Sequence, residues 1–267
     1  MDKFIVNGGK KLIGRTQVSG AKNMALKALV AACLTEEEVI IENIPLISDL
    51  LTMIDIIEEL GGAVSVSDHA ISVRAFKFKK TKIALQRAVE VRTSAMFMAP
   101  LLARMREAVI PNPGGCRIGA RPIDRTIEGL IQMGVDVKYK SSDGYFYMKA
   151  PSGLKGTDYT FKKSTHTGTE TLILAAVLAK GKTILRNSAQ EPEIDELISL
   201  LNQMGARIKK IQERVIEIEG VGKLSGTRFE VGPDRNEIVT LAIAGIITKG
   251  DIFIDGVKNI DLLSFIE

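Results

Sequence analysis

The feature that most constrains this chain is an internal repeat of roughly 70 residues. Laid against itself, the sequence gives four segments in register: 19–73, 92–148, 167–218 and 234 to the end. The anchors of their central β-branched stretches, spaced 69, 75 and 69 positions apart, are Ile41, Ile110, Leu185 and Ile254. Such a repeat predicts one supersecondary unit per segment, with neighbouring units burying a shared core.

Each segment has the same order of hydrophobic patterns. In the first, a small apolar helix (MALKALVAACL) precedes a short strand (EVIIEN) and an amphipathic helix (DLLTMIDIIEELGG). Two strands complete the unit, and Gly61, Gly134 and Gly205 end three of the amphipathic helices where a left-handed C-cap is expected. Counting a strand before the first helix (RTQV, AVEV, DYTF and RFEV), each unit is predicted to be β-α-β-α-β-β, an α/β fold.

The fourth segment stops inside its second helix, at Phe265, Ile266 and Glu267. Because a repeat buries its surface against its own later strands and its neighbours, we expect an open apolar face and a chain that is a piece of a longer protein. The alternative is a naturally degenerate terminal repeat, since terminal repeats are often atypical.

Composition excludes several classes of protein. The chain has 267 residues, 45% hydrophobic and 25% charged, as expected of a folded protein of one or two domains. A net charge of +4 without long basic runs, and 5% aromatics with no Trp, argue against nucleic acid as a partner. The longest apolar run, 171–179, is far shorter than a bilayer span of about 20 residues. We therefore expect a soluble, intracellular protein without a membrane partner. Only two cysteines occur, which agrees with a reducing compartment.

Cations recur where the first helix of a unit begins. Lys22 and Asn23 lie there in the first unit, Arg92 in the second and Lys163, within KKSTHTGTE, in the third. Polar helix caps explain Ser, Thr and Asp at such positions, but the helix dipole disfavours cations there. The pattern indicates a convergent anion-binding surface, although Lys22 taken alone is better explained as a solvated side chain beside an N-cap serine.

The most unusual stretch is PGGCRIGARPID, residues 113–124. Glycines on both sides of Cys116 allow the backbone to approach a ligand closely, and Arg117 and Arg121 surround the thiol with positive charge. This context predicts a functional thiol suited to proton transfer. In contrast, Cys33 in LVAACL is read as a small buried hydrophobic residue, and no neighbouring Cys or His suggests a zinc site.

Four motifs together (SGAKN, PGGCRIGARPID, EPEID and PDRNE) closely resemble the UDP-N-acetylglucosamine enolpyruvyl transferases, and the resemblance covers the whole chain in register. It implies repeated β-α-β-α-β-β units in an inside-out α/β barrel of two domains. By this analogy the first domain is 20–230, and the second is an incomplete one made of 1–19 plus 231–267. The resemblance implies no metal and no organic cofactor.

The resemblance also implies an activity and a site. The family transfers the enolpyruvyl group of phosphoenolpyruvate to the 3-hydroxyl of UDP-N-acetylglucosamine and releases phosphate, the first committed step of peptidoglycan precursor synthesis in the cytoplasm. Cys116 matches the catalytic loop cysteine that fosfomycin alkylates. The residues matching phosphoenolpyruvate contacts are Lys22, Asn23 and Arg121. The residues matching UDP-sugar contacts are Arg92, Arg121, Pro122, Ile123, Asp124, Arg125, Lys163, Ser164, Thr165 and His166.

Two positions depart from the family pattern. His166 stands where an aliphatic residue is typical, and Asn236 stands in PDRNE where Ile is usual. His166 is predicted either to donate a hydrogen bond to the nucleotide or to be an exposed turn residue, and His69 is read as a surface residue. A general-base aspartate and an arginine of the family lie beyond this chain, so we expect no turnover by the chain alone. The alternatives are a non-catalytic nucleotide-sugar-binding module and a shikimate-pathway enolpyruvyl transferase.

Overall fold

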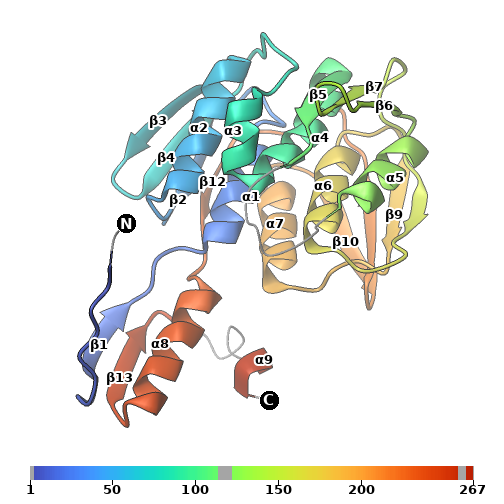
Figure 1. The fold of residues 1–267 in the computed structure, drawn as a ribbon. Coiled ribbons are helices and arrows are strands. Elements are labelled where there is room, and N and C mark those ends of the chain that lie inside the picture. The colour runs from blue at the N-terminus through green and yellow to red at the C-terminus, as the bar shows by residue number, and fades with distance from the viewer. Residues whose placement is uncertain (1–2, 114–121, 258–262, 267) are drawn as a thin grey trace.

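The computed structural model describes residues 3–113, 122–257 and 263–266. Three sheets surround a bundle of helices in the larger part of the molecule, and a smaller lobe holds β1, β13 and α8 (Figure 1). In chain order the elements are β1 (Ile13–Gln17), α1 (Lys22–Ala32), β2 (Val39–Glu42), α2 (Ser48–Leu60), β3 (Ala63–Ser67), β4 (Ala70–Arg74), α3 (Leu85–Glu90), the 3-10 helix η1 (Arg92–Phe97), α4 (Met98–Met105), β5 (Glu107–Pro111), α5 (Asp124–Gln132), β6 (Asp136–Lys140), β7 (Tyr145–Lys149), β8 (Asp158–Thr160), α6 (His166–Ala176), β9 (Lys182–Arg186), α7 (Pro192–Gln203), β10 (Arg207–Gln212), β11 (Val215–Glu219), β12 (Thr227–Glu230), α8 (Arg235–Ile247), β13 (Asp251–Asp255) and α9 (Leu263–Ile266).

The helices that open the first three units form the centre of the molecule. In α1 every residue from Met24 to Ala32 is buried, and α6 is buried from Gly168 to Ala176. Ala, Leu, Val and Ile make up much of both helices, and the buried polar residues among them include Lys27 in α1 and Glu170 in α6. Burial around the whole circumference is typical of a helix enclosed on all sides. Of the helix pairs, α4 with α6, α1 with α7 and α5 with α6 make the most extensive contacts. The outer strands β3 and β6 are largely exposed, so the sheets lie outside the helices.

Strands from distant parts of the sequence complete two of the sheets. The first unit's sheet has the order β12-β2-β4-β3, in which β12 runs parallel to β2. The strand before α1, β1, instead pairs in parallel with β13 in the smaller lobe. The RTQV segment therefore does not join the sheet of its own unit, because RFEV occupies that place. The other sheets have the orders β5-β7-β6 and β10-β11-β9-β8.

Most of the predicted unit is confirmed, with one strand wrong. Gly61, Gly134 and Gly205 all have positive φ after their helices, so they act as the expected left-handed caps. The AVEV segment is not a strand: α3 covers Leu85–Glu90. An earlier bridge replaces the strand, since Lys82 pairs in parallel with Val109 of β5, and residues 85–90 then coil back to the start of η1.

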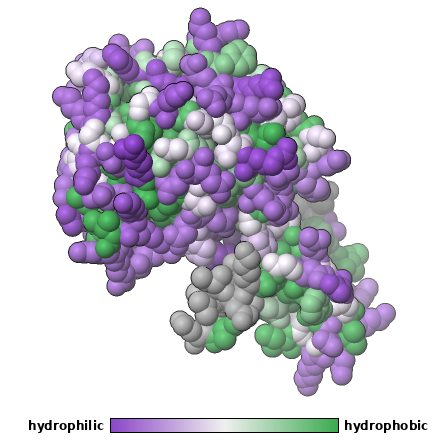
Figure 2. All heavy atoms as spheres, turned by 180° about the vertical axis from the view of Figure 1, so that it is seen from behind, coloured by the Kyte–Doolittle hydropathy of each residue, from purple (hydrophilic) through white to green (hydrophobic). Residues whose placement is uncertain are grey.

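The smaller lobe exposes apolar side chains. Ile246 and Ile247 of α8 are 68% and 74% exposed, and Phe253 of β13 is 59% exposed. Figure 2 shows green, hydrophobic side chains gathered on this lobe. In the part of the chain that the structure describes, no helix is both long and apolar enough to cross a membrane. The division into 20–230 and 1–19 plus 231–267 stays a prediction.

Candidate functional site

One pocket lies where the first helices of the second and third units begin. We call it the helix-start pocket; its volume is about 320 Å³. It is lined by Arg92, Pro122, Ile123, Arg125, Thr126, Lys163, Ser164, Thr165, His166, Thr167 and Gly168. Eight of the ten residues that match UDP-sugar contacts therefore meet in one cavity, although they come from three separate stretches of sequence.

The local sequence explains the shape of this pocket. Thr165 is the N-cap of α6, and its hydroxyl accepts a hydrogen bond from the Gly168 N–H at 3.3 Å. Outside the lining of the pocket, the Tyr159 hydroxyl donates to the Arg125 carbonyl oxygen at 2.8 Å, which fixes the first turn of α5. Burial raises the pKa of Tyr159 to about 12, so the hydroxyl keeps its proton at neutral pH. A helix N-terminus beside Arg125 and Lys163 is a suitable environment for an anion.

A buried ion pair lies beneath the helix-start pocket. Glu170, one turn after His166 in α6, is fully buried, and its Oε1 is 3.2 Å from the Lys27 ammonium of α1 and 3.1 Å from His166 Nε2. The His166 side chain is 24% exposed, so it is not an exposed turn residue. His69, by contrast, is exposed, as expected, with Nδ1 2.8 Å from the Ile44 carbonyl oxygen.

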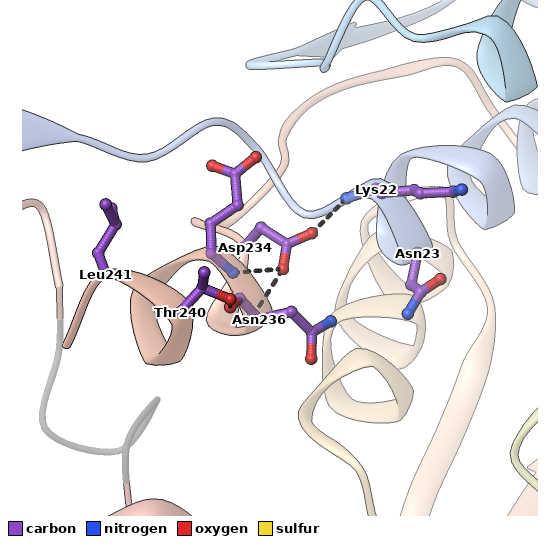
Figure 3. Close-up of a pocket in the computed structure, with 7 residues that line it drawn as sticks. Lys22, Asn23, Asp234, Asn236, Thr240 and Leu241 are labelled. Atoms are coloured by element: carbon purple, nitrogen blue, oxygen red, sulfur yellow. Dashed lines mark hydrogen bonds between the residues drawn. The ribbon is translucent and has the colours of Figure 1, made fainter. Parts of the chain in front are cut away.

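A second pocket, of about 460 Å³, lies where the chain crosses between the smaller lobe and the rest; we call it the crossover pocket. It is lined by Lys22, Asn23, Asp234, Asn236, Glu237, Thr240 and Leu241. Asp234 lies between the starts of two helices (Figure 3). Its Oδ2 accepts from the Lys22 N–H at 3.0 Å, and its Oδ1 accepts from the N–H groups of Asn236 at 2.7 Å and Glu237 at 3.4 Å. One carboxylate thus caps both α1 and α8.

The two crossing segments are also tied through their backbones. The Ala21 N–H donates to the Gly232 carbonyl oxygen at 2.8 Å, and the Asp234 N–H donates to the Ser19 carbonyl oxygen at 2.9 Å. Ser19 is not an N-cap of α1, because its hydroxyl donates to Glu237 Oε1 at 2.7 Å and Ala21 occupies the N-cap position. The crossing segments therefore hold Lys22 and Asn23 in a fixed place at the start of α1.

Both cations at these helix starts have acidic partners. The Lys22 ammonium is 2.8 Å from Asp49 Oδ2, in the first turn of α2. Arg235 Nε is 3.1 Å from Oε1 of Glu193, which is buried. Burial alone would raise the pKa of Glu193, but its backbone N–H, Arg235 and His166 together hold that pKa below its usual value.

Some predicted residues lie apart from the pockets or outside the described residues. Asp124 is exposed in the first turn of α5 and does not line the helix-start pocket. Cys116 and Arg121 lie outside the described residues. Cys33 is buried as predicted, and burial raises its pKa to about 12. Within the described ranges, no group of three or more His, Cys, Asp or Glu side chains comes together to hold a metal ion.

Comparison with known proteins identifies the family of the chain. Residues 6–265 match the family model described as EPSP synthase (3-phosphoshikimate 1-carboxyvinyltransferase). The chain belongs to this family. Solved structures agree on the fold: the enolpyruvyl transferase NikO from Streptomyces tendae superposes with a TM-score of 0.77 at 21% identity, over 88% of this chain and 55% of that one. An EPSP synthase from Acinetobacter baumannii has a TM-score of 0.68 at 19% identity, over 90% and 54%.

Two curated relatives are more similar to this chain in sequence than the two solved structures are. A UDP-N-acetylglucosamine 1-carboxyvinyltransferase from Acidobacterium capsulatum is 46% identical over 94% of this chain. A protein of the same name from Koribacter versatilis is 42% identical over 95% of it. The chain spans 58% and 59% of the lengths of these two relatives. The predicted resemblance and the inside-out α/β fold are thereby confirmed.

Two features of the site were not predicted from sequence. The double cap by Asp234 depends on a contact between residues 212 positions apart, which no local pattern indicates. The Lys27–Glu170 pair did leave a signal: each is the only Asp, Glu, Lys or Arg within a long apolar stretch, MALKALVAACL and ETLILAAVLA. Because charged residues are almost never fully buried unless paired, two such residues in central helices favour a partnership.

Proposed function

We propose that this chain is the larger part of an enzyme that transfers the enolpyruvyl group of phosphoenolpyruvate to the 3-hydroxyl of UDP-N-acetylglucosamine and releases phosphate. The observation that carries the proposal is the meeting of Arg92, Arg125 and the 163–166 turn in the helix-start pocket. The names of the curated relatives support the same substrates. In this proposal the helix-start pocket holds the UDP-sugar, while Lys22 and Asn23 of the crossover pocket contact phosphoenolpyruvate.

The residue types suit the proposed chemistry. A diphosphate and a phosphorylated carboxylate meet in the proposed complex, so fixed cations are needed to bind them and to stabilise the charge that develops as phosphate leaves. Lys22, Arg92, Arg125 and Lys163 supply such charge from different elements. Cys116 is proposed as the proton donor to the enol methylene and Arg121 as a further phosphoenolpyruvate contact, both on the sequence resemblance. We also propose the two-domain division at 20 and 230 and a place in the cytoplasm.

Two neighbouring lysines provide a matched test of the pocket. Lys163 lines the helix-start pocket, whereas Lys162 is 77% exposed and its ammonium is 2.9 Å from Glu128 Oε1. Calorimetric titration of the chain with UDP-N-acetylglucosamine is expected to show at least tenfold weaker binding for Lys163→Ala, which corresponds to about 1.4 kcal/mol. Lys162→Ala is expected to change the dissociation constant less than twofold. Equal effects of the two substitutions would contradict the assignment of this pocket.

The identity of the substrate needs two further measurements. Shikimate 3-phosphate is expected not to compete with the UDP-sugar, and competition would favour the shikimate-pathway alternative. Intact mass after incubation with fosfomycin is expected to show one adduct, mapped by peptide digestion to Cys116 and formed faster when UDP-N-acetylglucosamine is present. UDP-sugar binding with a thiol that alkylates only at an ordinary rate would favour a non-catalytic binding module.

A further inference from the structure

The helix-start pocket has two walls that come from neighbouring units. One wall is the start of α5, with Arg125, and the other is the 163–168 stretch, with Lys163. The two helices behind these walls touch: a Cβ at Gly129 of α5 would lie 2.3 Å from Leu172 Cδ1 of α6, which leaves no room for a side chain. This contact lies one turn beyond Arg125, so the position of Arg125 depends on what holds the first turn of α5.

The strand that leads to the Lys163 wall is firmly anchored. Its last buried ring is Phe161, which is 1% exposed. The Phe161 N–H donates to the Arg186 carbonyl oxygen at 3.0 Å, and the Phe161 carbonyl oxygen accepts from the Asn187 side-chain amide at 2.8 Å. The rings of Tyr159 and Phe161 pack edge to face, with their centroids 4.9 Å apart. Tyr159 is also buried, so its ring is a fixed point close to the pocket.

The Tyr159 hydroxyl connects this anchor to the opposite wall. It is 2.8 Å from the Arg125 carbonyl oxygen and 3.5 Å from Glu128 Oε2, so the carbonyl receives the stronger hydrogen bond. A carbonyl oxygen has two lone pairs, and Arg125 can therefore accept from Tyr159 as well as from its own helix. Because burial raises the pKa of Tyr159 to about 12, the donor proton is present throughout the neutral range.

We infer that Tyr159 is a positioning residue for the helix-start pocket: its hydroxyl holds the first turn of α5 so that Arg125 and Lys163 bind one diphosphate together. The inference rests on the proposed function for the identity of the ligand. A guanidinium donates in a fixed fork, and hydrogen bonds weaken steeply when the donor is misdirected, so a small rotation of this turn costs affinity. Tyr159 does not line the pocket, and it acts through Arg125.

A double-variant cycle separates positioning from a general structural role. The chain, Tyr159→Phe, Arg125→Ala and the double variant are each titrated calorimetrically with UDP-N-acetylglucosamine. Tyr159→Phe is expected to weaken binding about three- to tenfold, as for the loss of one hydrogen bond between neutral groups. Arg125→Ala is expected to weaken it at least about tenfold, since a charge-assisted contact is lost. In the Arg125→Ala background, Tyr159→Phe is expected to change the dissociation constant less than about twofold, because no guanidinium remains to be misplaced.

Tyr147 provides a matched control. Its hydroxyl also donates to a nearby acceptor, Asp143 Oδ2 at 2.7 Å, but it lies on β7, in a different sheet from Tyr159. Tyr147→Phe removes the same atom and is expected to change the dissociation constant less than about twofold in both backgrounds. Both substitutions keep the ring and its packing, and urea unfolding followed by far-UV circular dichroism checks that each variant is folded under the conditions of the titration.

The outcomes distinguish the inference from the proposed function, with UDP titrated in parallel as a probe of the diphosphate. UDP-N-acetylglucosamine binding that Tyr159→Phe leaves unchanged, or weakens equally in both backgrounds, overturns the inference and leaves the proposed function standing. UDP binding with the expected coupling between Tyr159 and Arg125, but no binding of UDP-N-acetylglucosamine, supports the inference and overturns the proposed substrate. No binding of either ligand overturns both.

Discussion

The Lys27–Glu170 pair allows a strong prediction about stability. The Glu170 side chain is fully buried and that of Lys27 is 6% exposed, so removing either partner leaves a charge in the core without its counterion. Breaking a buried pair in this way costs about 3–5 kcal/mol. Lys27→Met and Glu170→Leu are therefore each expected to lower the free energy of unfolding by about that amount.

The double variant is expected to behave differently. Replacing a buried pair by apolar residues of similar volume is often neutral or stabilising, so Lys27→Met with Glu170→Leu should lie within about 1 kcal/mol of the wild type or above it. Independent effects would instead sum to about 6–10 kcal/mol. Urea unfolding followed by far-UV circular dichroism at pH 7.5 gives the three values.

Helix α1, which carries Lys27, also carries Lys22, and the ion pair of Lys22 offers a control for the single and double variants. Lys22 and Asp49 form an ion pair of similar length, but their side chains are 46% and 31% exposed. Substitution of that pair is expected to change the unfolding free energy by at most about 1 kcal/mol, because exposed pairs contribute little. A double variant of Lys27 and Glu170 whose loss equals the sum of its singles would refute the reasoning.

Three other predictions concern single side chains. Asp234→Ala should lower the free energy of unfolding by about 2 kcal/mol, since two helices lose a cap worth about 1 kcal/mol each, and a loss under 0.5 kcal/mol in urea would contradict the double cap. The pKa of Glu193 is lowered in the folded protein, so the ionised carboxylate stabilises the native state. Wild type is therefore expected to be more stable than Glu193→Gln above about pH 4.3 and to lose this advantage as pH falls through the lower native pKa. A difference in urea midpoints that does not change with pH would argue against this prediction. In a Cys116→Ser protein, Cys33 should not react with a thiol reagent at pH 8 until urea unfolds the chain, and a fast native reaction would be inconsistent with a pKa of about 12.

Periodicity predicted most of the fold because each unit repeats the same local patterns. The apolar helices, the amphipathic helices and their glycine caps follow from spacing and from residues that tolerate positive φ. AVEV was misassigned because four residues are too few to distinguish a strand from a short helix by pattern, and the bridge between Lys82 and Val109 takes the place of the expected strand. The exchange of β1 and β12 between sheets could not be read locally, since both segments have the same strand pattern.

The candidate site shows the same division between local and distant information. The cations at helix starts were visible in sequence, and the structure brings Arg92, Arg125 and Lys163 into one pocket. The pairing of Lys27 with Glu170 requires side chains 143 positions apart, on α1 and α6, to meet in the core, and the sequence offers only two isolated charges as a signal. The chemistry of single residues was therefore easier to predict than the partners that tune it.

The pairing of β12 with β2 also affects how the chain is made. Arg228 on β12 forms an ion pair with Glu42 on β2, 186 positions earlier, so the first unit's sheet lacks its edge strand until most of the chain has been synthesised. At 5–20 residues per second this interval is roughly 10–40 s. During that time β2 presents unpaired N–H and C=O groups, and an open edge can pair with another nascent chain. Nascent chains shorter than about 230 residues therefore expose this unpaired strand edge, and we expect chaperones to bind them more than the complete chain.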